Sequence, residues 1–275
     1  STEYAKNAIG AKTTVVPIKT YILKNTKMLS SIEVGINKSF SNSINNLNGT
    51  TGAMKLQSFN SYNNIGSLQQ QGKIGDIPSS YIWDYNNTLM VAAASNAAPE
   101  DIAYTSFEAD GAGGWTISSA ERNATNSVTG TKSYDLSKGS ITKTGLSSSK
   151  NYWITYWAKT GTSVSATGTV QTIQGLTKNG FTFWKKKINA TSAITISGSG
   201  LIDELRLYPE GSQMTNYIYL PTIGILSKSD YAGLKYLDSR YVNHKVNVFM
   251  SSPVKLVPKT ATVRQVARIF IEKKI

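Results

Sequence analysis

Apolar and polar positions alternate in short runs along most of the chain, and turn residues separate the runs. From residue 103 to residue 209 the runs are about five to eight residues long, the usual length of a strand, and glycines fall between them. Short strands with regularly spaced turn signals are typical of β-sandwiches. The predicted strands are Ala103–Glu108, Trp115–Ser118, Lys132–Leu136, Ser140–Thr144, Tyr152–Lys159, Val164–Thr172, Phe181–Ile188, Ala193–Ser197 and Leu201–Tyr208.

The segments on either side of this region show the same alternation with less regularity. Residues 90–97 fit a strand or a short helix, and Pro99 ends the run. The tail over 263–275 is equally ambiguous between the two, and we favour a strand there. The other strands predicted in the flanks are Thr14–Ile18, Tyr21–Leu23, Met54–Phe59, Thr215–Leu220, Tyr231–Tyr241 and Val246–Met250.

These patterns predict an all-β protein, a β-sandwich flanked by short antiparallel strand segments. The composition agrees, because Gly, Ser, Thr, Asn and Tyr are abundant and charged residues make up only 16% of the chain. We divide the chain into four parts: a β-rich segment over 1–80, a connector over 81–102, the sandwich over 103–209, and irregular strands with a basic tail over 210–275.

The chain contains no cysteine, which excludes disulfides, thiolate metal sites and cysteine nucleophiles. No apolar run reaches the ~20 residues that a membrane-spanning helix needs. The first residues lack the basic-then-apolar pattern of a secretion signal. Either such a signal has been removed or the chain is an interior piece of a longer protein, and we expect the second.

The formal net charge of +13 raises the question of a polyanionic partner. Lysines and arginines are spread thinly, and Lys185–Lys187 is the only dense run. No nucleic-acid motif accompanies them, so we expect no specific nucleic-acid partner. A solvated basic surface is the favoured interpretation, and an acidic polysaccharide or lipopolysaccharide is the alternative.

The predicted strand Tyr152–Lys159 presents one apolar face and one mixed face, because side chains alternate along a strand. Tyr152, Ile154, Tyr156 and Ala158 form the better core face. In the strand Phe181–Ile188, by the same logic, the two phenylalanines are better core candidates than Trp184.

The other face of that strand carries Trp153, Thr155, Trp157 and Lys159. Two residues of rise place the two indoles about 7 Å apart. Exposed aromatic rings stack on sugar rings, so these four residues are the candidate glycan-binding platform. The alternative is that loops or a neighbouring segment cover the indoles, and for Trp153 we favour this alternative.

Catalysis finds little support in the sequence. His244 is the only histidine and has no acid cluster beside it. Glycoside hydrolysis needs two carboxylates across a cleft, whereas Asp203 and Glu204 are predicted to point to opposite faces of one strand. We therefore predict a protein that is not an enzyme.

Four motifs follow one another in the central region. They are Ala103–Glu108 followed by Gly114-Trp115, then Thr129–Tyr134, then Asn151–Lys159, and finally Ile202–Tyr208. In this order they resemble the motifs of carbohydrate-binding jelly-roll modules, so the resemblance implies that the sandwich is a jelly roll. The resemblance implies glycan binding. It also implies a structural calcium ion at Glu108 and Asp203, helped by carbonyl oxygens of the Thr-Gly-x-Lys turn, because Ca²⁺ prefers oxygen ligands. The alternative is that either acid caps a turn or pairs with Arg206 or Lys132.

The flanks carry a second set of motifs, Ser80–Asn86, Asn96-Ala97, Leu207–Pro209 and Met214–Tyr219. With these motifs the flanks resemble bacterial surface proteins of the RHS, or YD-repeat, family. The chain departs from that family, which usually has Gly where Asp84 stands and Asp where Leu220 stands. The resemblance implies a module inserted before a run of Tyr-Asp repeats, here degenerate.

Three functional hypotheses follow for a secreted or cell-surface protein. The module binds glycan or a partner protein, or it is a structural spacer of an RHS-like surface or effector protein. Alternatively, the chain is cargo or a partner of an outer-membrane secretion machine, since the resemblance is common among proteins of the type IX route. The tail Ile271–Ile275 is weakly similar to C-terminal signals of that route.

Overall fold

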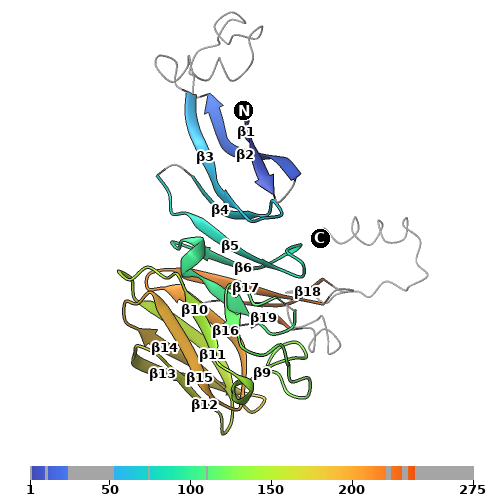
Figure 1. The fold of residues 1–275 in the computed structure, drawn as a ribbon, viewed down its shortest axis with the longest axis vertical. Coiled ribbons are helices and arrows are strands. Elements are labelled where there is room, and N and C mark those ends of the chain that lie inside the picture. Colours follow the sequence, from blue (N-terminus) through green and yellow to red (C-terminus); the bar gives the residue numbers. More distant parts are fainter. Residues whose placement is uncertain are drawn as a thin grey trace, which may run out of the picture. The chain divides into compact units, whose positions relative to one another are not determined.

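The computed structural model describes residues 2–9, 12–23, 53–73, 75–109, 111–220, 224–230 and 235–238 (Figure 1). All of these except Asp238 belong to one unit, residues 1–237. The predicted strand Val246–Met250, the tail over 263–275 and His244 lie outside the described residues. The described part is all-β, as predicted. Its helical segments are two short 3-10 turns, η1 (Pro99–Asp101) and η2 (Leu136–Lys138), and no described helix is long and apolar enough to cross a membrane.

One antiparallel sheet contains the strands of both flanks. Its strands follow the order β1-β2-β3-β4-β5-β6-β17-β18-β19, so neighbours in the sheet are neighbours in the sequence except at one step. The bounds are β1 Thr2–Ile9, β2 Lys12–Leu23, β3 Ala53–Tyr62, β4 Leu68–Lys73, β5 Ser79–Asp84, β6 Leu89–Ser95, β17 Gln213–Leu220, β18 Gly224–Ser229 and β19 Lys235–Asp238.

The exceptional step lies between β6 and β17. Ser95 pairs with Gln213 and Ala92 pairs with Asn216, so the residues between these two strands form an insertion into the sheet. Residues 81–102, expected as a connector, instead contribute β6 and most of β5 to the interior of this sheet. The ambiguous run over 90–97 is thereby a strand, because both of its edges have hydrogen-bonding partners.

The insertion folds as a sandwich of two antiparallel sheets, as predicted. One sheet has the order β12-β15-β10-β8, and the other has the order β13-β14-β11-β16-β7 with β9 added on β16. Between β10 and β16 the chain crosses repeatedly from one sheet to the other, as in a jelly roll. The bounds are β7 Ala103–Thr105, β8 Thr116–Ile117, β9 Tyr134–Asp135, β10 Ile141–Thr144, β11 Tyr152–Lys159, β12 Ser163–Ala166, β13 Thr169–Lys178, β14 Phe181–Ile188, β15 Ala193–Ser199 and β16 Leu201–Pro209.

The main core lies between these two sheets and confirms the face predicted for β11. Tyr152, Ile154, Tyr156 and Ala158 are all buried in it, beside isoleucines of β10 and β15. The prediction for β14 is wrong. Trp184 packs against this core, whereas Phe181 and Phe183 lie on the other side of the sheet, because residues opposite each other in an antiparallel pair share a face and Phe183 is opposite Trp157.

Two smaller apolar clusters lie outside the main core. One joins the sandwich to the long sheet through residues of β6, β7, β16 and β17 and of the segment between β6 and β7, namely Val91, Ala92, Ala94, Ala97, Ile102, Tyr104, Tyr208 and Met214. The other covers the outer face of the six-stranded sheet and consists of Val128, Trp157, Phe181, Phe183 and Leu201. The sandwich therefore has apolar layers on both sides of β11.

Candidate functional site

The predicted glycan platform is not an exposed surface. Only 3% of Trp157 is exposed, and its ring lies 5.4 Å from that of Phe183, centroid to centroid. Thr155 is fully buried. The expected exposure of these two residues is wrong. Trp157 lies in an apolar cluster with Val128, from the loop between β8 and β9, and with Phe181, Phe183 and Leu201. A sugar has no open ring face of Trp157 on which to stack.

Trp153 and Lys159 keep partial exposure but are engaged by neighbouring side chains. Lys185 Nζ lies 4.1 Å from the centroid of the Trp153 ring, a cation–π contact, and Lys187 Nζ lies 5.9 Å from it. Lys159 Nζ donates to Asn126 Oδ1 at 2.8 Å. The covered alternative for Trp153 agrees with its packing against the cluster that joins the sandwich to the sheet.

Glu108 and Asp203 hold the same loop. Glu108 Oε1 accepts hydrogen bonds from the backbone N–H groups of Thr131 (2.8 Å) and Lys132 (2.6 Å). Asp203 Oδ2 accepts from the N–H groups of Val128 (2.8 Å) and Thr129 (3.0 Å). The two acids predicted to ligate calcium thus act as anchors for residues 128–132, which agrees with the turn-capping alternative.

Both carboxylates are engaged by hydrogen-bond donors of the loop. Ca²⁺ requires several oxygen ligands, whereas each of these carboxylates is turned toward N–H donors of the loop. The described residues also contain no group of three or more histidine, aspartate or glutamate side chains placed to hold a metal. Calcium at Glu108 and Asp203 stays a prediction that rests on the resemblance alone.

A buried polar network that the sequence did not reveal lies beside Asp203. Glu204 and Arg206 are fully buried and form an ion pair, with 3.0 Å between Glu204 Oε2 and Arg206 Nη2. Thr129 Oγ1 donates to Glu204 Oε1 at 2.5 Å, and the Tyr104 hydroxyl donates to Oε2 at 3.3 Å. Buried charges are stable when they are paired and hydrogen-bonded, and Glu204 meets both conditions.

A β-bulge explains why Asp203 and Glu204 do not alternate as predicted. Residues 203 to 206 of β16 lie opposite Trp157 to Thr155 of β11, so β16 has one extra residue there. Glu204 itself has the left-handed φ of 55°. The bulge turns both carboxylates into the interior, and the prediction that they occupy opposite faces of a regular strand is wrong.

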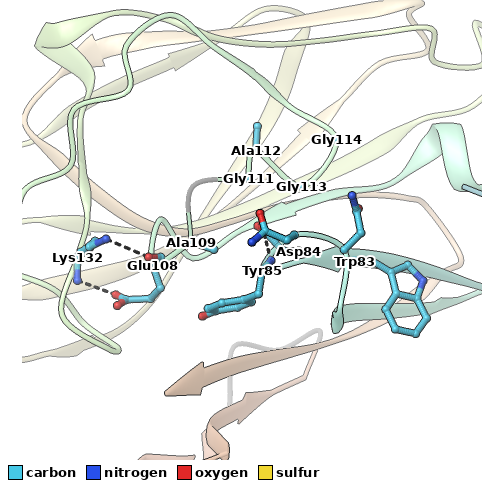
Figure 2. A pocket seen from close by; sticks show the side chains of 12 residues that line it. Trp83, Asp84, Tyr85, Glu108, Ala109, Gly111, Ala112, Gly113, Gly114 and Lys132 are labelled. Atoms are coloured by element: carbon cyan, nitrogen blue, oxygen red, sulfur yellow. Dashed lines mark hydrogen bonds between the residues drawn. The ribbon is translucent and has the colours of Figure 1, made fainter. Parts of the chain in front are cut away.

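A pocket of about 720 Å³ lies where the turn between β5 and β6 meets a loop of the sandwich (Figure 2). The turn contributes Trp83, Asp84, Tyr85, Asn86 and Asn87, and the sandwich contributes Glu108, Ala109, Gly111, Ala112, Gly113, Gly114 and Lys132. Figure 2 shows the ring of Tyr85 between Glu108 and Asp84. The described lining is thus rich in hydrogen-bonding groups and carries two aromatic rings.

Close approach of glycine backbone shapes one wall of this pocket, and residues with left-handed backbone form the other. A Cβ at Gly111 would lie 2.1 Å from Asp84 Oδ1, and a Cβ at Gly113 would lie 1.5 Å from the Tyr104 carbonyl oxygen. Gly113 also has the positive φ of 56°. On the opposite wall, Tyr85, Asn86 and Asn87 have φ values of 52°, 59° and 58°. Three consecutive left-handed residues that are not glycine are costly, and such strain is concentrated at functional sites.

The aromatic side chains of the pocket are held by carbonyl oxygens of the long sheet. The Tyr85 hydroxyl donates to the Tyr219 carbonyl oxygen at 3.0 Å, and Trp83 Nε1 donates to the Leu68 carbonyl oxygen at 2.7 Å. Burial raises the pKa of Tyr85 to about 12, and the charges of Glu108 and Asp84 add to this effect. Tyr85 is therefore neutral at physiological pH, and its hydroxyl proton is used in the hydrogen bond to the Tyr219 carbonyl oxygen.

Glu108 and Lys132 were singled out from the sequence, as a metal ligand and its alternative partner, but the pocket was not predicted. Asn86-Asn87 between two apolar runs indicates a tight turn, and Gly111–Gly114 indicates a loop that needs close backbone approach. Nothing in the sequence brings this turn and this loop together. A comparison of the chain with protein-family models and with curated proteins finds no match.

Proposed function

We propose that the chain is a non-catalytic structural section of a secreted or cell-surface protein, in which a long antiparallel sheet carries a β-sandwich as a built-in module. The observation that supports this most is the pairing of β6 with β17, which continues the sheet across the insertion. A module connected by a flexible linker would need no such pairing.

The contacts at the base of the insertion support a rigid connection. Ser212 Oγ donates to the Asn96 carbonyl oxygen at 2.5 Å, and Asn96 Nδ2 donates to the Gly211 carbonyl oxygen at 3.2 Å. The segment that leaves β6 and the segment that enters β17 are therefore hydrogen-bonded to each other at the base of the insertion. Deeper in, Arg206 Nη1 donates to the carbonyl oxygen of Asp230, just beyond β18, at 2.6 Å.

The location outside the cell rests on the resemblance of the flanks to RHS proteins and is part of the proposal. The same resemblance supports export by an outer-membrane secretion machine. For a structural section of such a protein, the role of the sandwich is to widen or stiffen the sheet into which it is inserted.

Thermal unfolding of the whole chain tests the structural role. A sandwich that shares an apolar cluster with the sheet, and whose buried Arg206 donates to the Asp230 carbonyl oxygen beyond β18, unfolds together with the sheet, so calorimetry is expected to give one main transition for both. Two well-separated transitions, one for the sandwich and one for the sheet, would show an independent module and contradict the proposal.

Glycan binding is the second candidate function, and the pocket at the β5–β6 turn favours it. Aromatic rings beside amide and carboxylate groups suit a hydroxyl-rich ligand. A glycan array with the whole chain tests this, with Asn86→Ala and Trp153→Ala as the variants. Loss of binding only in Asn86→Ala supports the pocket, and loss only in Trp153→Ala supports the outer face of β11. If the whole chain binds no glycan on the array, the structural role is the one that remains.

A further inference from the structure

The edge strand β13 is the most exposed long strand of the sandwich. It lies at the margin of the six-stranded sheet, and among the described strands it pairs on one side only, with β14. Every residue from Val170 to Thr177 is exposed, and the stretch contains no charged residue and no proline. Three of its side chains are large and apolar: Val170 is 55% exposed, Ile173 is 42% exposed and Leu176 is 68% exposed.

The other described edges are protected in ways that β13 is not. Proteins keep sheet edges from pairing by making them short or charged. β12 has four residues and β7 has three, whereas β13 has ten. β1, at the margin of the long sheet, carries Glu3 and Lys6. The two bulges of β13 give partial protection, but they leave the run from Gln171 to Gln174 in regular register.

The charges near β13 indicate which kind of strand it accepts. The nearest cluster is Lys185–Lys187 on β14, which at first favours an acidic partner. Two of these lysines are already engaged, since Lys185 lies over the Trp153 ring and Lys187 pairs with Glu210 at 2.6 Å. The edge is itself neutral from Thr169 to Thr177, so an uncharged strand matches it best.

We propose that two copies of this chain associate through β13, strand beside strand in antiparallel orientation. A β13 strand has the uncharged, β-branched composition that the edge accepts, and antiparallel pairing is self-complementary under twofold symmetry. Pairing about the middle of the strand places Lys178 of one copy opposite Thr169 of the other, so the two lysines lie at opposite ends.

The β14 lysines of the two copies do not oppose this arrangement. Three strand spacings of ~4.8 Å separate the two β14 strands, which is about 14 Å. This exceeds the screening length of ~8 Å at physiological salt, so the repulsion between these lysines is largely screened. The interface is a small one and belongs to the weak, transient class.

Sedimentation velocity of the whole chain over a concentration series tests the proposal, from low micromolar to several hundred micromolar in physiological salt. The wild type is expected to show a reversible equilibrium between monomer and dimer. The double variant Ile173→Lys/Leu176→Lys puts two charges on the edge, and its association is expected to be at least ~10-fold weaker. Both residues are exposed, so the melting temperature is expected to stay close to that of the wild type.

The double variant Ile65→Lys/Ile77→Lys is the matched control. These isoleucines are 50% and 57% exposed and lie in turns of the long sheet, so the variant carries the same added charge away from β13. It is expected to dimerise like the wild type. A wild type that stays monomeric throughout the series would overturn the proposal. A dimer that survives in the β13 variant would also overturn it, because the contact would then lie elsewhere. The same holds if both variants weaken the dimer equally, because association would then depend on net charge alone.

Discussion

Replacement of Trp157 by alanine distinguishes most directly between a structural and a sugar-binding role for the outer face of β11. Only 3% of Trp157 is exposed, and its side chain packs with Val128, Phe181, Phe183 and Leu201. Removal of a buried indole takes away these contacts and leaves a cavity that the surrounding strands fill only in part. The free energy of unfolding is therefore expected to fall by about 3–5 kcal/mol.

Urea unfolding of the whole chain, followed by circular dichroism, measures this loss. The midpoint is expected to shift strongly with little change in slope, because the unfolded chain exposes nearly the same surface. At roughly 2–4 °C per kcal/mol for a chain of this size, the melting temperature is expected to fall by roughly 6–20 °C.

Trp153→Ala is the matched control, since the same side chain lies four residues earlier on the same face with partial exposure. It loses mainly a cation–π contact and part of an apolar contact, so about 1–2 kcal/mol is expected. If Trp157→Ala costs less than Trp153→Ala, the loop with Val128 does not cover β11, and the argument against the sugar platform fails.

Three further variants test the network, the pocket wall and the pH dependence. Glu204→Gln breaks the buried ion pair and is expected to cost about 3–5 kcal/mol in urea unfolding, whereas Glu121→Gln removes an exposed pair and is expected to change nothing measurable. Gly113→Ala is expected to be far more destabilising than Gly145→Ala, because both have a positive φ but only the first Cβ meets backbone. Burial alone would raise the pKa of Asp101, but hydrogen bonds from a lysine, a tyrosine and a backbone N–H outweigh it and lower the pKa. The ionised Asp101 therefore stabilises the fold above its unfolded pKa of about 3.9, and this stabilisation is lost as pH falls through the lower folded pKa. In Asp101→Asn the melting temperature is expected to fall less steeply below pH ~4 than in the wild type.

The sequence by itself indicated most strands of the sandwich and which face of β11 enters the core. It did not separate β12 from β13, which the predicted strand Val164–Thr172 merges although they lie in different sheets, and it did not indicate β1, β4 or β18. Strand formation depends on local alternation and turn residues, and Tyr152, Ile154, Tyr156 and Ala158 are close enough in the chain for their shared face to be deduced. The all-β class and the sandwich follow from the same local signals.

Tertiary structure alone decided whether the opposite face is open. Trp157 is buried because Val128, from a different part of the chain, lies over it, and no periodicity within β11 reports such coverage. The bulge at Glu204 is equally hidden, since a single extra residue shifts the alternation by one and depends on pairing with β11.

The pairing of β6 with β17 is the largest feature that the local pattern could not supply. Ser95 and Gln213 pair although the whole sandwich separates them in the chain, so their pairing is a long-range contact. The pocket also depends on tertiary structure. The Asn86-Asn87 turn and the Gly111–Gly114 loop both line it, and the sandwich and the long sheet that carry them are joined by the apolar cluster at the base of the sandwich. Local propensity fixes strands, whereas these sites depend on contacts between residues far apart in the chain, which the sequence pattern does not encode.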